Sequence, residues 1–168
     1  LFKFFCWEDW AGEIKLNNKN IATIGSDFKE EIVYVGHKNS LNNDLTTIEN
    51  LEYLSAFDST TDISNTANIR NLMKNLNIEK YKNYRVSDIS EGNKKKISLM
   101  RLLLTKKKIW LLDEPMSYLD DESINMLINI FIEHQKKGGL IFLTTHYDFS
   151  KKINACKVYT MKDAELTW

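Results

Sequence analysis

Cysteine is scarce in this chain, and its scarcity excludes one common kind of site. Cys6 and Cys156 are the only two cysteines among 168 residues, and they lie far apart in the sequence. Their separation matches no spacing typical of a metal site. Two isolated cysteines suit a reducing compartment, in which thiols stay free. We therefore expect no metal centre built on cysteine.

Long apolar runs and an excess of charge of one sign are also missing. No run is long enough to span a bilayer and no signal peptide is visible, so any membrane association is expected to come through a partner. Lys plus Arg number 23 and Asp plus Glu also number 23, which gives a formal net charge of zero. This balance argues against a nucleic-acid partner, because such proteins carry an excess of basic residues.

Short runs that are apolar, or that alternate between apolar and polar residues, are typical of strands. They occupy residues 13–16, 32–35, 109–112, 140–143 and 158–161. The third and fourth runs are apolar throughout, which predicts strands that are covered on both faces. A helical repeat over residues 124–131 separates these two runs, and Gly138 and Gly139 are expected to end that helix. Strand, helix and strand at this spacing indicate a parallel α/β sheet.

The middle of the chain has a helical pattern. One helix is expected to begin at a cap on Thr46 or Thr47, and another is expected to follow Ser90. Between them, apolar residues at helical spacing predict a helix over residues 69–78. Residues 58–65 are polar and predict a loop.

These patterns predict one α/β domain over residues 1–168, with no Pro- or Gly-rich linker and no internal repeat. Residues 1–38 and 108–168 would form the sheet, and residues 39–107 would form a helical subdomain to one side of it. Residues 1–7 are rich in large apolar side chains and predict the inner end of a buried helix.

The most specific motif is a pair of carboxylates directly after an apolar strand. Asp113 and Glu114 follow residues 109–112, and Pro115, which has no N–H to donate, is expected to end the strand. The carboxyl edge of a parallel sheet is where such folds bind ligands. Asp113 would hold a magnesium ion, directly or through water, and Glu114 would orient and deprotonate an attacking water. The alternative is a buried strand followed by a solvated acidic turn.

A second motif precedes the third expected helix. The segment Ile89-Ser90-Glu91-Gly92-Asn93, followed by Lys94-Lys95-Lys96, resembles the ABC signature, whose usual form is Leu-Ser-Gly-Gly-Gln and a basic stretch. The free N–H groups and the dipole at a helix N-terminus attract phosphate. The alternative is an ordinary Ser cap followed by a solvated face rich in lysine.

Two further segments extend the resemblance to the ABC family of ATPases. Residues 116–120, ending in Asp120, are similar to the D-loop that couples two ATP sites, and Thr144-Thr145-His146 is similar to the switch histidine. Signature, acidic strand, D-loop and histidine occur here in the order and at the spacing of that family. The resemblance implies a P-loop NTPase fold of the RecA-like kind. It also implies that Ser90 and Gly92 contact ATP held by a second subunit, and that His146 contacts its γ-phosphate.

Other residues narrow the resemblance. The segment Tyr34-Val35-Gly36-His37 occupies the place of the family's Q-loop, where most members carry Gln. The Gly-His pair there, with Trp110 and His134 further along, is similar to the CcmA subgroup, the haem-exporter ATPases of cytochrome c maturation. The similarity covers nearly the whole chain. It implies that His37 lies between the nucleotide and a membrane subunit; the alternative is a turn residue without a role.

The family's phosphate loop, Gly-x-x-Gly-x-Gly-Lys-Ser/Thr, is expected just before Leu1, and none of it occurs in this sequence. The first strands of the family's sheet are missing with it, which would leave a strand edge unpaired. The sequence also lacks an initial Met, so we expect the natural N-terminus to lie further upstream. Three alternatives remain: a longer subunit, a separate polypeptide that supplies the N-terminal part, or a protein that has lost ATP binding.

Some motif residues favour the loss of ATP binding, and others favour its retention. Glu91 stands where the family has a small residue, and its carboxylate would repel a γ-phosphate; Asn93 is shorter than the usual Gln. These two substitutions favour the loss of ATP binding. The presence of Asp113, Glu114 and His146 favours its retention.

The resemblance implies an ATP-binding and ATP-hydrolysing subunit with Mg²⁺ as its metal. Its partners would be integral membrane subunits and a second nucleotide-binding subunit. Three functions follow: release of a haem-loaded chaperone in cytochrome c maturation, transport of another substrate, or a non-catalytic scaffold. Asn, Lys and Ile are abundant, as in proteins of AT-rich genomes. We therefore expect a peripheral protein on the matrix side of the mitochondrial inner membrane, with the cytoplasmic face of a bacterial membrane as the alternative.

Overall fold

The computed structural model describes residues 13–56 and 66–148, and beyond them residues 153, 157, 160–162 and 165–167. The predicted helix end at residues 1–7 and the predicted loop at 58–65 lie outside the described residues, as do both cysteines. Within the described part of the chain, no helix combines the length and the apolar character needed to cross a membrane.

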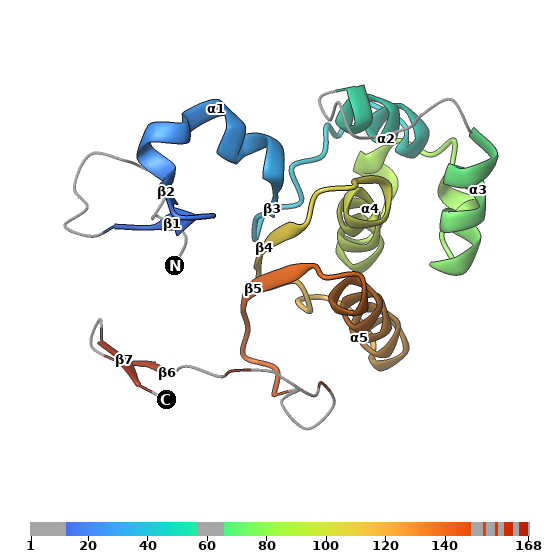
Figure 1. Ribbon diagram of the computed structural model, residues 1–168. Coiled ribbons are helices and arrows are strands. Elements are labelled where there is room, and N and C mark those ends of the chain that lie inside the picture. Colours follow the sequence, from blue (N-terminus) through green and yellow to red (C-terminus); the bar gives the residue numbers. More distant parts are fainter. Residues whose placement is uncertain are drawn as a thin grey trace.

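Three parallel strands form the central sheet, as the sequence predicts (Figure 1). The sheet consists, in spatial order, of β3 (Ile32–Val35), β4 (Ile109–Asp113) and β5 (Leu140–Thr144). Val35 pairs with Leu112, and Asp113 pairs with Thr144. Because the strands are parallel and in register, their carboxyl ends meet at one edge of the sheet.

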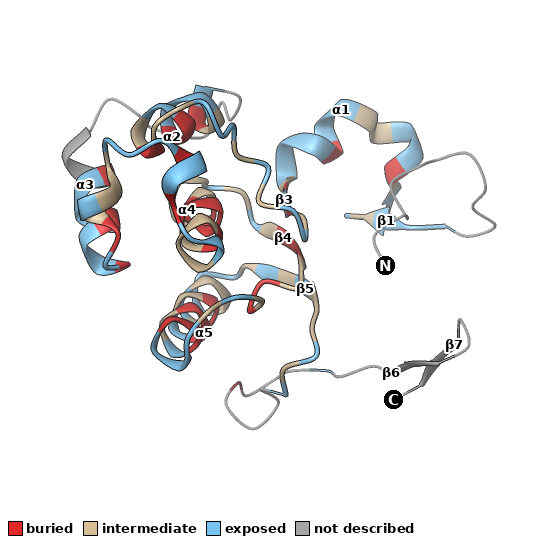
Figure 2. Ribbon diagram, turned by 180° about the vertical axis from the view of Figure 1, so that it is seen from behind, coloured by how far each residue is buried: buried red, intermediate tan, exposed pale blue. Residues whose placement is uncertain are grey.

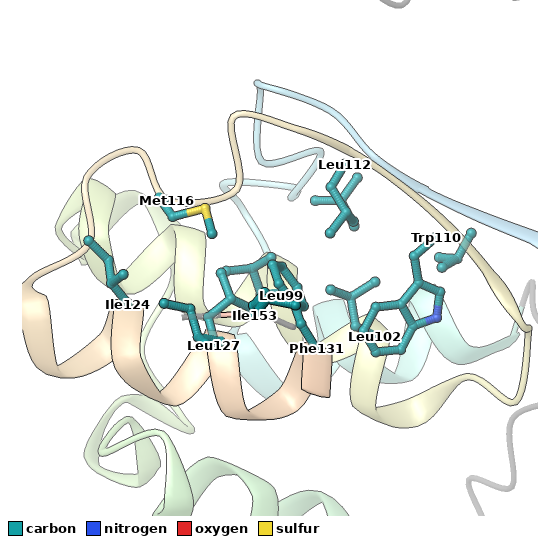
Figure 3. Close-up of a cluster of buried hydrophobic side chains, with 12 residues drawn as sticks. Leu99, Leu102, Trp110, Leu112, Met116, Ile124, Leu127, Phe131 and Ile153 are labelled. Atoms are coloured by element: carbon teal, nitrogen blue, oxygen red, sulfur yellow. The ribbon is translucent and has the colours of Figure 1, made fainter. Parts of the chain in front are cut away.

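Helices α4 (Glu91–Leu104) and α5 (Asp121–Lys136) lie on one side of this sheet (Figure 1). Alternate strand residues, among them Val35, Trp110 and Leu112, point to that side and are buried. They pack with helix side chains into one core (Figure 3). The other members of this core are Val33, Leu99, Leu102, Met116, Ile124, Leu127, Ile128, Phe131 and Ile153. Burial of each large apolar side chain stabilises the fold by about 1.5–3 kcal/mol.

The opposite face of the sheet is largely exposed, which corrects one expectation. Strand β5 was predicted to be covered on both faces, but Figure 2 shows part of it in the colour of exposed residues. Leu140 is 49% exposed and Phe142 is 51% exposed. Tyr34 on β3 is 42% exposed on the same face, while Leu111 on the central strand is buried. β5 has only one neighbouring strand in the described sheet, so its outer face and its outer edge both lack cover.

A second apolar cluster joins α4 to two further helices, α2 (Thr47–Ala56) and α3 (Thr66–Asn75). The cluster consists of Leu51, Ile69, Met73, Leu76, Ile78, Ile89, Ile97 and Met100. Both helices confirm the sequence prediction. Figure 1 shows α3 on the far side of α4 from the sheet and α2 next to α4. Short 3₁₀ turns at Glu79–Tyr81 and Val86–Asp88 connect α3 to α4. The subdomain boundary at residues 39–107 stays a prediction.

Thr46 caps α2 through a reciprocal capping box. Its hydroxyl accepts from the N–H of Glu49 at 3.3 Å, and its own N–H donates to the Glu49 carboxylate at 2.7 Å. Of the two threonines that the sequence offers as caps, the structure therefore selects Thr46. The buried side chain of Asn50 accepts from the N–H of Asn42 at 2.7 Å and so ties the preceding loop to this helix.

The N-terminal part contains a hairpin and a helix. Strands β1 (Lys15–Leu16) and β2 (Lys19–Asn20) pair through a turn in which both Asn17 and Asn18 have positive φ, as a two-residue hairpin requires. This confirms only the end of the strand predicted at residues 13–16. Helix α1 (Ile21–Glu31) follows and was not predicted.

The helix α5 ends as predicted, at the glycine pair. Gly138 has a φ of +79°, and its N–H donates to the carbonyl of Gln135 at 2.9 Å. Beyond β5, strands β6 (Thr160–Lys162) and β7 (Glu165–Thr167) form an antiparallel pair. Of the strand predicted at residues 158–161, only Thr160 and Met161 lie among the described residues.

Candidate functional site

The candidate site lies where β4 and β5 end side by side. Asp113 is the last residue of β4, and its register partner Thr144 is the last residue of β5. The Thr144 hydroxyl donates a 2.6 Å hydrogen bond to Oδ1 of Asp113. This bond fixes the orientation of the carboxylate at the edge of the sheet, where the sequence predicts a metal ligand.

Glu114 leaves the strand in an unusual conformation. Its φ is +46°, a region that costs a non-glycine residue about 1–3 kcal/mol. Its N–H donates to the Thr144 carbonyl at 3.1 Å, which holds the backbone in place. Oε1 of Glu114 lies 3.4 Å from Nε2 of His146, whose side chain is 98% exposed. The structure thus brings together Asp113, Glu114 and His146.

His37 lies at the same edge but apart from this group. It follows Gly36, the first residue after β3, whose last residue Val35 pairs with Leu112. Its side chain is exposed and makes no hydrogen bond or ion pair to any described residue. The structure therefore places His37 two residues beyond the end of β3, the strand next to the one that ends in Asp113, without assigning it a contact.

Ser90 stands immediately before α4, as predicted, but it is not an ordinary cap. Its backbone has the extended conformation of a cap residue, yet its side chain accepts no hydrogen bond from a backbone N–H of the first helical turn. Its hydroxyl accepts instead from Nδ2 of Asn93 at 3.0 Å. Ser90 therefore leaves the first N–H groups of α4 available, which is what a phosphate-binding helix terminus needs.

Gly92 packs against the turn that follows β4. A Cβ atom added to it would lie 2.6 Å from the carbonyl oxygen of Tyr118, so only glycine fits at this point. The signature-like segment and the turn after the acidic pair are thus in direct contact within one chain.

Glu91 does not stand alone at the helix terminus. Its carboxylate forms an ion pair with Lys94 at 2.9 Å and accepts from Nδ2 of Asn39 at 3.4 Å. A carboxylate paired in this way repels an approaching phosphate less than a free one would. Glu91 is therefore weaker evidence against ATP binding than the sequence alone indicates.

Asp120 has a structural role that its sequence position did not reveal. It is the N-cap of α5, and its carboxylate accepts from the N–H of Ser123 at 2.8 Å and from the Ser123 hydroxyl. These hydrogen bonds, with a smaller contribution from Lys96 at 3.8 Å, lower the pKa of Asp120. A role for Asp120 in coupling two nucleotide sites stays a prediction.

Asp113 and Glu114 at the carboxyl end of β4, which we call the acidic edge, fit a magnesium ion that is held mainly by other ligands. Among the described residues, no three side chains of the types His, Cys, Asp and Glu gather into a metal-binding cluster. Mg²⁺ usually takes one or two protein carboxylates and completes its octahedral shell with phosphate and water oxygens. Asp113 and Glu114 match that requirement, and Asp113 is the one already oriented by a neighbour.

A cavity of the described structure lies elsewhere. Its volume is about 640 Å³, and Lys107, Lys108 and Trp110 line it at the amino end of β4. His134 also lines it and stacks on Trp110, with ring centroids 3.6 Å apart. Burial lowers the pKa of His134, although a hydrogen bond to the Lys108 carbonyl opposes that effect. Because ligands of parallel sheets bind at the carboxyl edge, we do not assign the nucleotide to this cavity.

Two residues of the site were missed from the sequence. Thr144 was noted only as part of a motif, although a hydroxyl residue ending the strand beside the acidic one was a usable signal. Lys95 was considered only as part of a basic stretch or, in the alternative, of a solvated lysine-rich face, but its side chain is completely buried. Only Lys94 and Lys96 of that run reach solvent, and their side chains are each just 16% exposed.

Comparison with known sequences agrees with the geometry. Residues 1–117 match the profile of the ABC transporter family. A cytochrome c biogenesis ATP-binding export protein CcmA from Sodalis glossinidius is 29% identical over 94% of this chain and 73% of its own length. The protein of the same name from Aliivibrio fischeri is 30% identical over 87% of this chain and 70% of its own length.

Solved structures show the same fold. The ATP-binding subunit of an ABC transporter superposes with a TM-score of 0.70 at 23% identity and covers 83% of this chain. The ATP-binding cassette MJ0796, in a dimeric post-hydrolysis state with ADP and Pi, gives a TM-score of 0.67 at 20% identity over 81% of this chain. The present chain spans 58% and 63% of the lengths of these two proteins. The fold is therefore the α/β fold of P-loop NTPases, as predicted.

Proposed function

The chain belongs to the ABC transporter family, and on that premise we propose that it is the ATP-hydrolysing subunit of a membrane transport complex. One observation carries the proposal: an oriented Asp113 and a strained Glu114 lie beside His146 at the carboxyl edge of the sheet. A phosphate loop on residues upstream of Leu1, or on another chain, would complete the site.

Each residue of this edge has a distinct role in the proposal. Glu114 accepts a proton from the attacking water, and His146, 3.4 Å away, orients that water and contacts the γ-phosphate. Asp113 would hold a magnesium ion, and that ion would supply positive charge to balance the phosphates of ATP. Ser90 and Gly92, at the open N-terminus of α4, contact the phosphates of ATP on a second subunit.

The transported substrate is the finer part of the proposal. The matching relatives named above are called export proteins of cytochrome c biogenesis, and the similarity extends over most of this chain. We therefore assign the chain to a complex that releases a haem-loaded chaperone during cytochrome c maturation. Its partners would be integral membrane subunits and a second nucleotide-binding subunit, with His37 between the nucleotide and a membrane subunit.

The proposal makes the chain a peripheral protein of the membrane that houses this complex. The two relatives named above come from bacteria, which supports the cytoplasmic face of a bacterial membrane. Placement on the matrix side of the mitochondrial inner membrane rests only on the abundance of Asn, Lys and Ile.

A non-catalytic scaffold is the second candidate. One observation favours it: the carboxylate of Glu91 lies in the first turn of α4, next to the place expected for a γ-phosphate. The ion pair with Lys94 reduces the repulsion between Glu91 and a phosphate. It does not remove that repulsion, because the Glu91 side chain is still 58% exposed. A scaffold would share the membrane partners of an ATPase but would bind no nucleotide.

The partner proposal is tested by purifying the full-length protein from its native membrane. We expect integral membrane subunits and proteins of cytochrome c maturation to co-purify in fixed ratio. Recovery with membrane subunits of a different transport system would contradict the haem assignment and leave the ATPase assignment intact. Recovery without any membrane subunit would contradict both.

A further inference from the structure

Lys95 presents an unexplained buried charge. It lies in the first half of α4, between Lys94 and Lys96, and its side chain is 0% exposed. The two neighbouring lysines have carboxylate partners, Glu91 at 2.9 Å and Asp120 at 3.8 Å. Lys95 has no carboxylate within 4.0 Å among the described residues. A buried ammonium without close pairing costs several kcal/mol, so its presence requires an explanation.

The contact that Lys95 does make identifies its surroundings. Its Nζ donates to the carbonyl of Gly36 at 3.5 Å, which is the upper limit for a hydrogen bond. In the parallel ladder Val35 pairs with Leu112, so Gly36 comes level with Asp113. The ammonium therefore approaches the carboxyl edge from the side of α4, beside the strand end that carries the acidic pair.

The charges that act on Lys95 are consistent with a position near the acidic pair. Burial lowers the pKa of Lys95, whereas the negative charges of Asp113 and Glu114 act to raise it. A cation shielded from water interacts with nearby carboxylates more strongly than one on the surface, because the surrounding dielectric constant is lower. Asp113 and Glu114 are therefore the carboxylates that oppose the effect of burial on the Lys95 ammonium.

We propose that Lys95 is the internal counter-cation of the Asp113–Glu114 pair and a positioning residue of the acidic edge. Its ammonium balances two adjacent carboxylates and holds the Gly36 carbonyl, and with it the loop that carries His37, against α4. The benefit to catalysis rests on the proposed ATPase function, whereas the charge balance itself does not. The chain would thereby keep the acidic edge in a defined geometry before magnesium and nucleotide arrive.

A double-mutant cycle on the full-length subunit in its purified complex tests this role. Lys95→Met is made in the native background and in a background carrying Asp113→Asn with Glu114→Gln, and the melting temperature of the subunit is measured. We expect Lys95→Met to lower the melting temperature by about 3 °C or more in the native background, because two carboxylates lose their counter-charge. In the neutral background we expect it to raise the melting temperature, because it removes an uncompensated buried cation.

Lys94→Met is the matched control, since it is the same substitution one position away on the same helix. Its effect should be equal in the two backgrounds. The same shift for Lys95→Met in both backgrounds would show that only the packing of its side chain matters and would overturn the proposal. If Lys95→Met prevents assembly, Lys95→Gln takes its place in the cycle. A complex that shows the sign reversal but hydrolyses no ATP would overturn the ATPase proposal and leave the counter-cation role standing.

Discussion

Replacement of Glu114 by Gln is expected to reduce ATP hydrolysis by the assembled complex about 10²- to 10⁴-fold, the usual contribution of a general base. Gln has the shape of Glu and can keep the left-handed backbone that the turn requires, but it cannot accept the proton of the attacking water. Binding should change much less, so we expect the KM for ATP to stay within about threefold while kcat falls. Phosphate release by the purified complex measures both constants.

Glu122→Gln provides the control for this experiment. Glu122 is exposed in the first turn of α5 and lies outside the acidic edge. We expect the Glu122 variant to hydrolyse ATP at the native rate. Native kcat in the Glu114 variant would remove Glu114 from the role of base, whatever the control shows.

Replacement of Trp110 by Ala is expected to lower the free energy of unfolding by about 3–5 kcal/mol. Trp110 is 3% exposed on the central strand and packs between α4 and α5 in the main core (Figure 3). Its Nε1 donates to the Lys107 carbonyl at 3.1 Å, and its ring stacks on His134. Because the free energy of unfolding of a whole domain is only about 5–15 kcal/mol, this loss would leave the folded state only slightly stable or unstable.

Chemical denaturation of the full-length subunit, followed by circular dichroism, measures that change. Trp110→Phe is the matched variant, because it keeps an aromatic ring in the core and loses only part of the buried area and the N–H donor. We expect it to cost clearly less than Trp110→Ala, about 1–2 kcal/mol. A loss below about 1 kcal/mol for the alanine variant would mean that the sheet does not depend on this core.

The sequence predicted the elements whose pattern is local and strong. The apolar run before Asp113, the helix after Asp120 and the glycine pair at its end all depend on neighbouring residues, and the structure confirms them. Helix α1 was missed because Gly25, at a φ of +41°, divides it and because only Ile21 and Phe28 of its residues are buried. The apolar spacing that remains is too sparse to distinguish a helix from a polar connection.

Burial was harder to predict, because it depends on what lies beyond each element. The run at residues 140–143 is as apolar as the run at 109–112, yet only the latter occupies the centre of the sheet. Lys95 is the opposite case, a charged residue that is buried. Three consecutive lysines predict a solvated face, but a helix turns each of them in a different direction, and the middle one points inward. Neither outcome can be read from residue type alone.

The candidate site was predictable as a set of motifs but not as a geometry. Asp113, Glu114 and His146 were proposed from their order in the chain, and the structure brings the last two within 3.4 Å. Three contacts were found only in the structure. They are the hydrogen bond from Thr144 to Asp113, the pairing of Glu91 with Lys94 and the cap formed by Asp120. The first joins two strands that are distant in the sequence. The other two join residues three apart, a spacing that permits such contacts without fixing the side-chain conformations that form them.

The most direct test of the ATPase proposal is nucleotide occupancy in the native complex. The complex is purified with its full-length subunits, saturated with Mg-ATP under conditions that prevent turnover, and its structure is determined. We predict a nucleotide whose phosphates lie between Asp113 and Glu114 of one subunit and Ser90 of a second nucleotide-binding subunit. An empty site at saturating nucleotide would contradict the proposal and identify this chain as a scaffold with the fold of an ATPase.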